Sequence, residues 1–403
     1  MYIVPILFFL SFVFSIINFS LGGMSIYFYM FIPFIDINYL KWIISLKIKK
    51  NMLVYLCALV LIAFLVSINS GSLYYFIKPI LLFFSVAYIV YLYIHRYSAF
   101  KLVYYFTTIS VIFAVAQFIL SYIGDSTVIE PPSIADMLWG KYAIQSRGGF
   151  DDGVLFQYRV AGLSKEPGFF SSFLMCIFLV YLYDVRIKSK TLLLFFVIGI
   201  ILSLSKITVA FGVIVPIIYL FDKYVIKLDK IHLLVGALIY ILLCVCVVYV
   251  LYNTYDFISK TYTNPWLAET YLHRSIGYYV LTSLFEPSVI SSFIWGGITE
   301  HLSEVIKEFP FLANLRFVNI QPDIVFFSSG GAYIILQYSF LFYAIFILFL
   351  RFLGVGFYSF VIFSLFSSNV NYFAYENWII LGYVFMFICS SSKKINKGIL
   401  NGY

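Results

Sequence analysis

Residues 73–123 read LYYFIKPILLFFSVAYIVYLYIHRYSAFKLVYYFTTISVIFAVAQFILSYI. Two apolar runs, near 73–94 and 99–123, flank the basic cluster HRYSAFK at 95–101. A helix needs about 20 mostly apolar residues to cross a bilayer, and both runs reach that length. The stretch therefore predicts two membrane-spanning helices joined by a short basic loop.

The whole chain has the composition of a membrane protein. Of its 403 residues, 63% are hydrophobic and only 11% are charged, whereas soluble domains carry about 25% charged residues. We expect a single all-α, polytopic integral membrane domain over residues 1–403 with about twelve transmembrane helices. The expected spans lie near 3–20, 24–45, 51–68, 73–94, 99–123, 168–185, 190–204, 206–221, 231–252, 331–350, 353–369 and 375–391.

The positions of the basic residues predict which way the loops face. Lys and Arg fall in short clusters between apolar runs, as in cytoplasmic loops, and not on a basic face interleaved with aromatics of the kind that binds nucleic acid. With both termini in the cytoplasm, two long loops, at about 124–167 and 253–330, are expected on the external side. One helix over 190–221 would put the basic cluster at 222–230 on the wrong side, so the pattern favours a helical hairpin there.

Neither a metal ion nor another cofactor is predicted. The five cysteines all lie within apolar runs, where a thiol behaves as a small hydrophobic side chain, and no dense group of metal ligands stands out. Asp36 and Lys78 lie inside expected spans, where charge is costly and often functional. One expectation is that these two side chains pair with each other.

Charge gathers at the stretch RVAGLSKEP, 159–167. Arg159, Lys165 and Glu166 stand before an apolar run, and Pro167 suits the first turn of a helix. A helix N-terminus at the external face carries free N–H groups and partial positive charge, and arginine adds a bidentate fork, so this point suits a phosphate. The alternative is an interfacial ion pair at an ordinary helix entry.

The same stretch resembles the Arg-x-x-Gly-Leu-x-x-Glu-Pro-like sequence that enters a span in the O-antigen polymerase (Wzy) family. The match lies at Arg159, Gly162, Leu163, Glu166 and Pro167. The two long external loops resemble the architecture of the wider polymerase and ligase superfamily over nearly the whole chain. The resemblance implies a fold similar to the membrane core of C-type glycosyltransferases (GT-C).

The second long loop carries further features that resemble this superfamily. Arg274 opens an expected helix that runs to the Gly-rich turn at 295–297, and Asp323 precedes a small-residue entry into the next span at 330–331. O-antigen ligases tend to have a histidine near that last place. The aspartate therefore favours a polymerase over a ligase.

The resemblance implies a substrate and a reaction. The substrate is an oligosaccharide repeat unit on undecaprenyl diphosphate, and the growing glycan moves onto the next lipid-linked unit at the periplasmic face of the inner membrane. This would make the chain a membrane glycosyltransferase of lipopolysaccharide biosynthesis. Its expected partners are the lipid bilayer, a chain-length regulator and a flippase.

The implied site needs cations for the diphosphate and a base for the acceptor hydroxyl. Arginines, not a metal ion, are expected to neutralise the diphosphate. The expected catalytic residues are Glu166, Asp323 and His273. The expected diphosphate-binding residues are Arg159, Arg274, Lys165 and Arg147.

Three other functions share parts of this pattern. A lipid-linked oligosaccharide flippase would also have about twelve spans, but alternating access is often built on repeated halves, and no internal repeat is visible here. An O-antigen ligase would use the same donor with a lipid A core acceptor. Other C-type glycosyltransferases commonly show an acidic pair in the first external loop, which is nearly absent in this chain.

Overall fold

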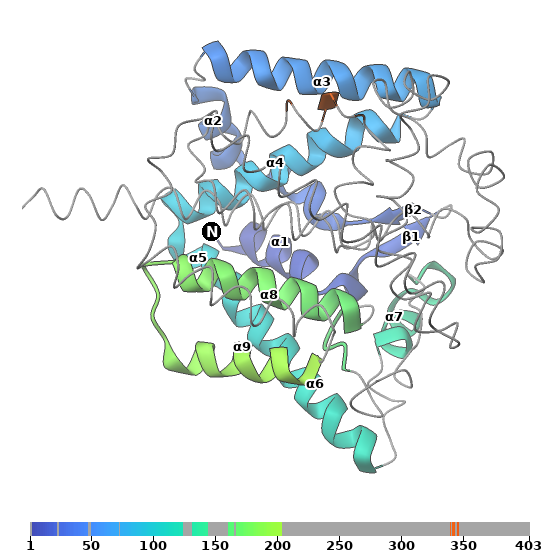
Figure 1. Ribbon diagram of the computed structural model, residues 1–403, viewed down its shortest axis with the longest axis vertical. Helices are drawn as coiled ribbons and strands as arrows, with labels where there is room; N and C mark the ends of the chain where they lie inside the picture. The colour runs from blue at the N-terminus through green and yellow to red at the C-terminus, as the bar shows by residue number, and fades with distance from the viewer. Residues whose placement is uncertain are drawn as a thin grey trace, which may run out of the picture. The chain divides into compact units, whose positions relative to one another are not determined.

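The computed structural model describes residues 2–21, 24–46, 50–71, 73–123, 131–143, 160–164, 167–203, 339, 341–342 and 345. This part of the chain is mostly helical (Figure 1). The helices are α1 (Ile3–Val13), α2 (Ile37–Ser45), α3 (Lys50–Ser70), α4 (Tyr74–His95), α5 (Tyr97–Phe100), α6 (Leu102–Ile123), α7 (Pro131–Trp139), α8 (Pro167–Tyr183) and α9 (Lys190–Ser203). Strands β1 (Phe19–Leu21) and β2 (Met24–Ile26) pair antiparallel.

The described residues belong to two compact units. The first unit holds α1, α2, most of α4 and everything from α5 to α9, within residues 2–46 and 81–203. The second unit holds α3 and the first turns of α4, together with the few described residues between 339 and 345.

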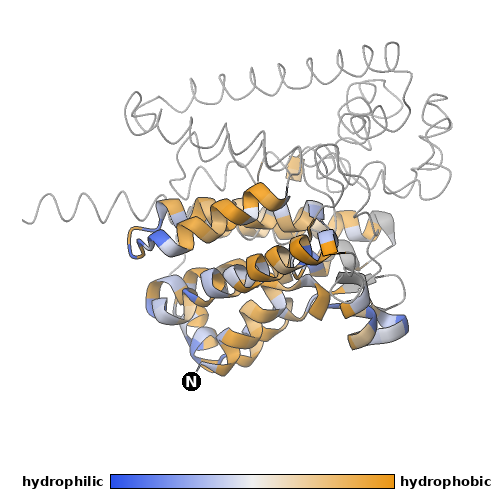
Figure 2. Ribbon diagram, turned by 90° about the horizontal axis from the view of Figure 1, so that it is seen from below, coloured by the Kyte–Doolittle hydropathy of each residue, from blue (hydrophilic) through white to orange (hydrophobic). Residues whose placement is uncertain are grey.

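Within the described part, two helical stretches are long and apolar enough to cross a membrane. They are Phe76–His95 in α4 and Tyr97–Ile123 across α5 and α6. Helices are confirmed at the runs expected near 73–94 and 99–123, and α3, α8 and α9 likewise coincide with expected runs. Figure 2 shows apolar residues along these helices and hydrophilic residues near several helix ends. Helices thus form where expected between residues 50 and 123 and again between 167 and 203, but within the described residues the stretches Leu56–Ile68, Pro167–Tyr183 and Lys190–Ser203 are shorter than a membrane span.

The first 46 residues depart from the expected pattern. Helix α1 has 11 residues, which is about 17 Å of helix against a bilayer core of about 30 Å. The chain then forms a 3₁₀ turn at Ser15–Ile17, the β1–β2 hairpin and two more 3₁₀ turns before α2. The prediction of continuous helices over 3–20 and 24–45 is wrong, and the all-α description must admit one small hairpin.

The side chain of Asn18 explains where α1 stops. Its Oδ1 accepts hydrogen bonds from Ser11 Oγ and from the N–H of Phe28, each at 3.0 Å, and its Nδ2 donates to the carbonyl of Ser11 at 3.0 Å. Ser11 Oγ also accepts from the N–H of Tyr29 at 2.9 Å. Two buried polar side chains thus take the place of helical backbone bonds and turn the chain back beside α1.

Aromatic side chains fill the space between α1 and its neighbours. Phe8, Phe9 and Phe12 are fully buried on α1. The ring of Phe8 meets Tyr88 of α4 edge-on, with centroids 4.9 Å apart, and Phe12 meets Phe173 of α8 at 5.5 Å. These contacts fix α1 between α4 and α8 and set the core of the first unit.

Helices α6, α8 and α9 pack closely together, as Figure 1 shows. Gly199 of α9 makes the close approach possible, because a Cβ atom there would lie 2.6 Å from Leu174 Cδ2 and 2.8 Å from Val111 Cγ2. The three helices therefore hold one another in a fixed register.

The first unit has two chemically different ends. The basic end is defined by residues 95–101 and 184–190. The start of α1 lies beside it, because the hydroxyl of Tyr2 is 3.1 Å from Ser98 Oγ. The motif end, defined by residues 19–26, 131–143 and 160–164, is joined by a bridge between Phe19 and Ala143. Helices α6 and α8 each run from one end to the other. The loops predicted as cytoplasmic at 95–101 and 186–190 thus share one end, opposite the described residues of the first long loop that is predicted to be external (Figure 1).

Candidate functional site

The motif stretch is folded into a tight turn between Val160 and Ser164. The N–H of Ser164 donates to the carbonyl of Ala161 at 3.0 Å, and Gly162 has a φ of +56°. All five residues of this turn are buried. Helix α8 begins three residues later, and the prediction that Pro167 opens this helix is confirmed.

The side-chain amide of Gln117 on α6 holds this turn. Its Oε1 accepts from the N–H of Ala161 at 3.1 Å and from the N–H of Gly162 at 2.8 Å, and its Nε2 donates to the carbonyl of Gly162 at 2.9 Å. Gln117 is itself buried. A buried backbone that leaves its own regular structure needs such partners, because an unmade hydrogen bond there costs about 1–3 kcal/mol.

One helical face of α6 supplies the rest of the contact. Ser110 Oγ accepts from the N–H of Leu163 at 3.0 Å. A Cβ atom at position 162 would lie 2.6 Å from Ser110 Oγ and 2.9 Å from the ring of Phe170. Gly162 is required here twice, for its left-handed backbone and for the absence of a side chain.

The sequence contains a signal for this contact that a count of apolar residues misses. Thr107, Ser110, Ala114, Gln117 and Ser121 are small or polar, lie at alternating spacings of three and four, and are all buried. That spacing places them on one face of α6. A polar stripe within an apolar helix predicts a polar partner inside the protein, here the backbone of residues 161–163.

The geometry of the turn limits what it can bind. The N–H groups of Ala161 and Gly162 donate to Gln117, that of Leu163 donates to Ser110, and that of Ser164 donates within the turn. None of these four is left to form an anion-binding nest of backbone N–H groups. The backbone of residues 161–164 therefore offers no N–H group to an anion.

The predicted site residues themselves lie outside the described residues. This holds for the catalytic candidates Glu166, Asp323 and His273 and for the diphosphate-binding candidates Arg159, Arg274, Lys165 and Arg147. Three of them are covalent neighbours of described residues, because Arg159 precedes Val160, Lys165 follows Ser164 and Glu166 precedes Pro167 in the chain. The structure therefore describes the residues next to these three candidates, and not the candidates themselves.

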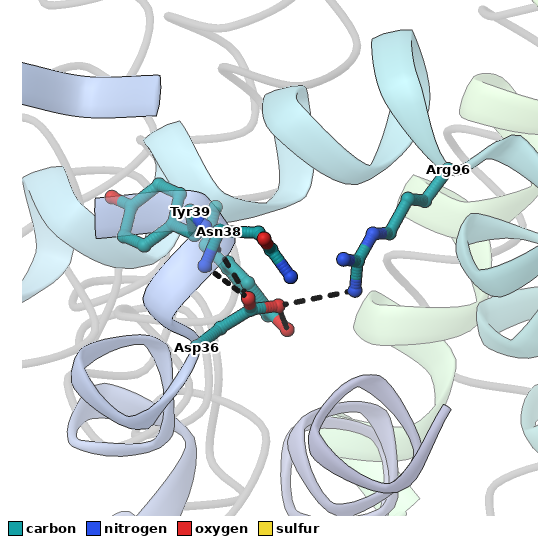
Figure 3. A network of polar contacts seen from close by, with 5 residues as sticks. Asp36, Asn38, Tyr39 and Arg96 are labelled. Carbon is teal, nitrogen blue, oxygen red and sulfur yellow. Dashed lines mark hydrogen bonds and ion pairs between the residues drawn. The ribbon is translucent and has the colours of Figure 1, made fainter. Parts of the chain in front are cut away.

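A second polar cluster lies at the basic end, around Asp36. Its Oδ1 accepts from the N–H of Asn38 at 3.1 Å and of Tyr39 at 3.3 Å, which caps the N-terminus of α2. Its Oδ2 lies 3.5 Å from Arg96 Nη1 and accepts from the hydroxyl of Tyr88 at 3.1 Å. Figure 3 shows the carboxylate of Asp36 facing the guanidinium of Arg96. Asp36 thus pairs with Arg96, where the sequence predicts Lys78.

A third polar cluster surrounds Asp184, directly after α8. Its Oδ2 accepts from the hydroxyls of Tyr97 and Tyr104, each at 2.8 Å, and its Oδ1 accepts from the N–H of Arg186 at 3.1 Å. Arg186 Nη1 donates to the carbonyl of Tyr93 at 2.6 Å. This cluster ties the loop between α8 and α9 to the junction of α4 and α5.

The two buried carboxylates are thus fully engaged, and their role is to join elements. Asp36 joins α2 to α4, and Asp184 joins the end of α8 to α5 and α6. Both are buried, so neither has the open access that a general base needs. Across the described residues, no group of three or more His, Cys, Asp or Glu side chains is placed to hold a metal ion.

Comparison with protein-family models, with curated proteins and with solved structures finds no match to this chain.

Proposed function

We propose that this protein is a polytopic inner-membrane polymerase of a surface polysaccharide, of the O-antigen type. It would have about twelve spans, both termini in the cytoplasm and its reaction at the periplasmic face. The growing glycan on undecaprenyl diphosphate would be transferred onto the next lipid-linked repeat unit.

One observation supports this proposal over a simple interfacial ion pair. Residues 160–164 form a buried turn that makes three hydrogen bonds with Gln117 and one with Ser110. A charged side chain that only anchors the protein at a lipid interface does not need a fixed backbone, so an anchoring role does not require such a turn. A site that must place a cation and a carboxylate against a reacting group needs fixed backbone on both sides.

The proposed reaction is a glycosyl transfer without a metal ion. The acceptor hydroxyl oxygen attacks the anomeric carbon of the donor, the bond from that carbon to the diphosphate oxygen breaks, and undecaprenyl diphosphate leaves. Arg159 and Arg274 bind the diphosphate and stabilise the charge that grows on it. Glu166 or Asp323 accepts the proton of the attacking hydroxyl.

The arrangement of the two ends is consistent with this assignment. The motif turn packs on the second half of α6, toward the end of the first unit that holds residues 131–143 of the first long predicted external loop (Figure 1). The opposite end carries the basic loops. Basic loops favour the cytoplasmic side, so the motif turn would face the periplasm, where the lipid-linked repeat units are polymerised.

The first experiment is complementation of a deletion strain, with the surface polysaccharide displayed by gel. Deletion should leave a single-repeat band, and the wild-type gene should restore the ladder. Arg159→Ala should leave the single-repeat band at normal protein level. Lys141→Ala is the matched control, because this exposed cation lies in the same predicted loop and should restore the full ladder.

Two outcomes would reject parts of the proposal. Loss of all surface glycan on deletion, including the single repeat, would indicate a flippase or a ligase. A full ladder from Arg159→Ala at normal protein level would leave the polymerase assignment standing but would make Arg159 an interfacial anchor.

A further inference from the structure

The basic end of the first unit carries more positive charge than its carboxylates neutralise. Lys101, Arg186, Lys188 and Lys190 lie in its two loops or at the first residue of α9. The helix dipoles largely offset one another there, because α4 and α8 end at this point while α6 and α9 begin. The excess positive charge therefore comes from side chains.

Two of these cations share one aromatic ring. The guanidinium carbon of Arg186 lies 5.2 Å from the ring centroid of Tyr97, and Lys101 Nζ lies 5.6 Å from the same centroid. Arg186 is held in place by its hydrogen bond to the carbonyl of Tyr93. A tyrosine ring weakly attracts cations but carries no net charge to neutralise them.

The nearby carboxylates have other partners. Among the described residues of this end, the carboxylates are Asp36 and Asp184, and both are buried. Asp36 is paired with Arg96, and Asp184 accepts two tyrosine hydroxyls and one backbone N–H. Because the partners of Asp184 are uncharged, its carboxylate still offsets the charge of one cation. An anion from outside the described residues is the counter-charge that suits the other three cations.

Apolar surface begins one helical turn away from the cations. Tyr105, four residues after Lys101 on the same helical face, is 48% exposed, and Leu194, four residues after Lys190, is 58% exposed. A ligand that covers both surfaces has an anionic head and an apolar body. This favours a phospholipid over a nucleic acid or an acidic peptide, because these lack the apolar part.

We propose that the basic end is a binding surface for the phosphate headgroups of anionic phospholipids. Lys101, Arg186, Lys188 and Lys190 contact the phosphates, and the acyl chains lie along the exposed sides of α6 and α9. The proposal rests on the membrane location proposed above and not on the polymerase activity. Its surface is at the end opposite the motif turn, so its ligand is not the lipid-linked substrate.

The test is a lipid titration of the full-length protein in zwitterionic detergent micelles. Short-chain phosphatidylglycerol is the probe, short-chain phosphatidylcholine is the neutral comparison, and binding is followed by the shift in melting temperature. Each basic side chain at an anionic surface contributes enough that its removal should weaken phosphatidylglycerol binding about 5-fold. We expect this loss for Lys101→Gln and for Lys188→Gln, and about 30-fold for the double variant.

Lys141→Gln is the matched control. Lys141 Nζ also lies over a tyrosine ring, at 5.0 Å from the centroid of Tyr142, but at the motif end. The Lys141→Gln variant should bind phosphatidylglycerol as the wild type does. The proposal fails if Lys141→Gln weakens binding as much as Lys101→Gln, if the double variant binds normally, or if phosphatidylcholine binds equally well. It also fails if millimolar inorganic phosphate gives the same shift, since the site would then take free phosphate.

Discussion

The side-chain amide of Gln117 forms two hydrogen bonds with one residue 45 positions later, accepting from the N–H of Gly162 and donating to its carbonyl. A neighbouring β-strand would satisfy the N–H and the carbonyl of a residue in the same way. Here the side chain of one residue on an apolar helix does so. Loss of this amide should lower the stability of the protein substantially. Gln117→Leu keeps the apolar volume but leaves three buried backbone groups without partners, so we expect the unfolding free energy to fall by about 2–4 kcal/mol.

Denaturant unfolding in detergent micelles measures this effect. Ile119→Leu, on an exposed position of the same helix, should unfold like the wild type. Equal stability of Gln117→Leu and Ile119→Leu would show that the turn is held by something other than this amide.

A second prediction compares two glycines with left-handed backbones. Gly162 has a φ of +56° and no space for a Cβ atom, whereas Gly140 has a φ of +52° and open space around it. Gly140→Ala should lower the unfolding free energy by about 1 kcal/mol, because alanine disfavours the left-handed backbone. Gly162→Ala adds overpacking against Ser110 and Phe170 and should cost about 2–4 kcal/mol in total.

The difference between these two variants measures the close approach of α6, because the backbone term is common to both. Thermal unfolding of the two proteins in the same detergent is sufficient. Equal losses would mean that Ser110 moves aside at no cost.

A third prediction separates the two roles of Asp36. Asp36→Asn keeps a good helix cap but removes the ion pair with Arg96, and Asp36→Ala removes both. The side chain of Arg96 is 26% exposed, so water can hydrate its guanidinium when the ion pair is removed. We therefore expect the unfolding free energy to fall by about 1 kcal/mol for Asp36→Asn and by about 2 kcal/mol for Asp36→Ala.

A double-mutant cycle with Arg96→Gln measures the pair directly. The two single variants should be coupled by about 0.5–1 kcal/mol. Strictly additive losses would show that Asp36 acts as a cap alone.

A fourth prediction concerns the two tyrosines that share Asp184. Each hydroxyl donates to the same oxygen, so Tyr97→Phe or Tyr104→Phe leaves one donor in place. Each single variant should lower the unfolding free energy by about 1–2 kcal/mol. The double variant should lose more than the sum, because the buried carboxylate oxygen then has neither donor. An additive double variant would indicate that the N–H of Arg186 alone keeps the carboxylate satisfied.

The sequence predicts the long helices well and the polar contacts poorly, for a physical reason. Long apolar runs favour helices, so α3, α4, α6, α8 and α9 form where the sequence predicts them. Among the described residues, Phe76–His95 and Tyr97–Ile123 also have the length of a membrane span. At Ser11 and Asn18, short polar side chains compete with the helix for backbone hydrogen bonds, and hydropathy does not register this competition.

The contacts of the candidate site were harder to foresee because their partners are distant in the chain. Gln117 meets residues 161 and 162, and Asp36 meets Arg96, so periodicity within one helix cannot identify either pair. The motif stretch did predict where α8 begins, because the chemistry of Pro167 is local.

The position of Ser110 and Gln117 ahead of the turn has a consequence for assembly of the chain. A protein is synthesised and inserted from its N-terminus, so α6 emerges before residues 160–164. Both side chains that bind the backbone of the turn lie on that earlier helix. The turn can therefore bind to α6 as soon as it is synthesised. Its hydrogen bonds with Ser110 and Gln117 can form before the ribosome has made the second half of the protein.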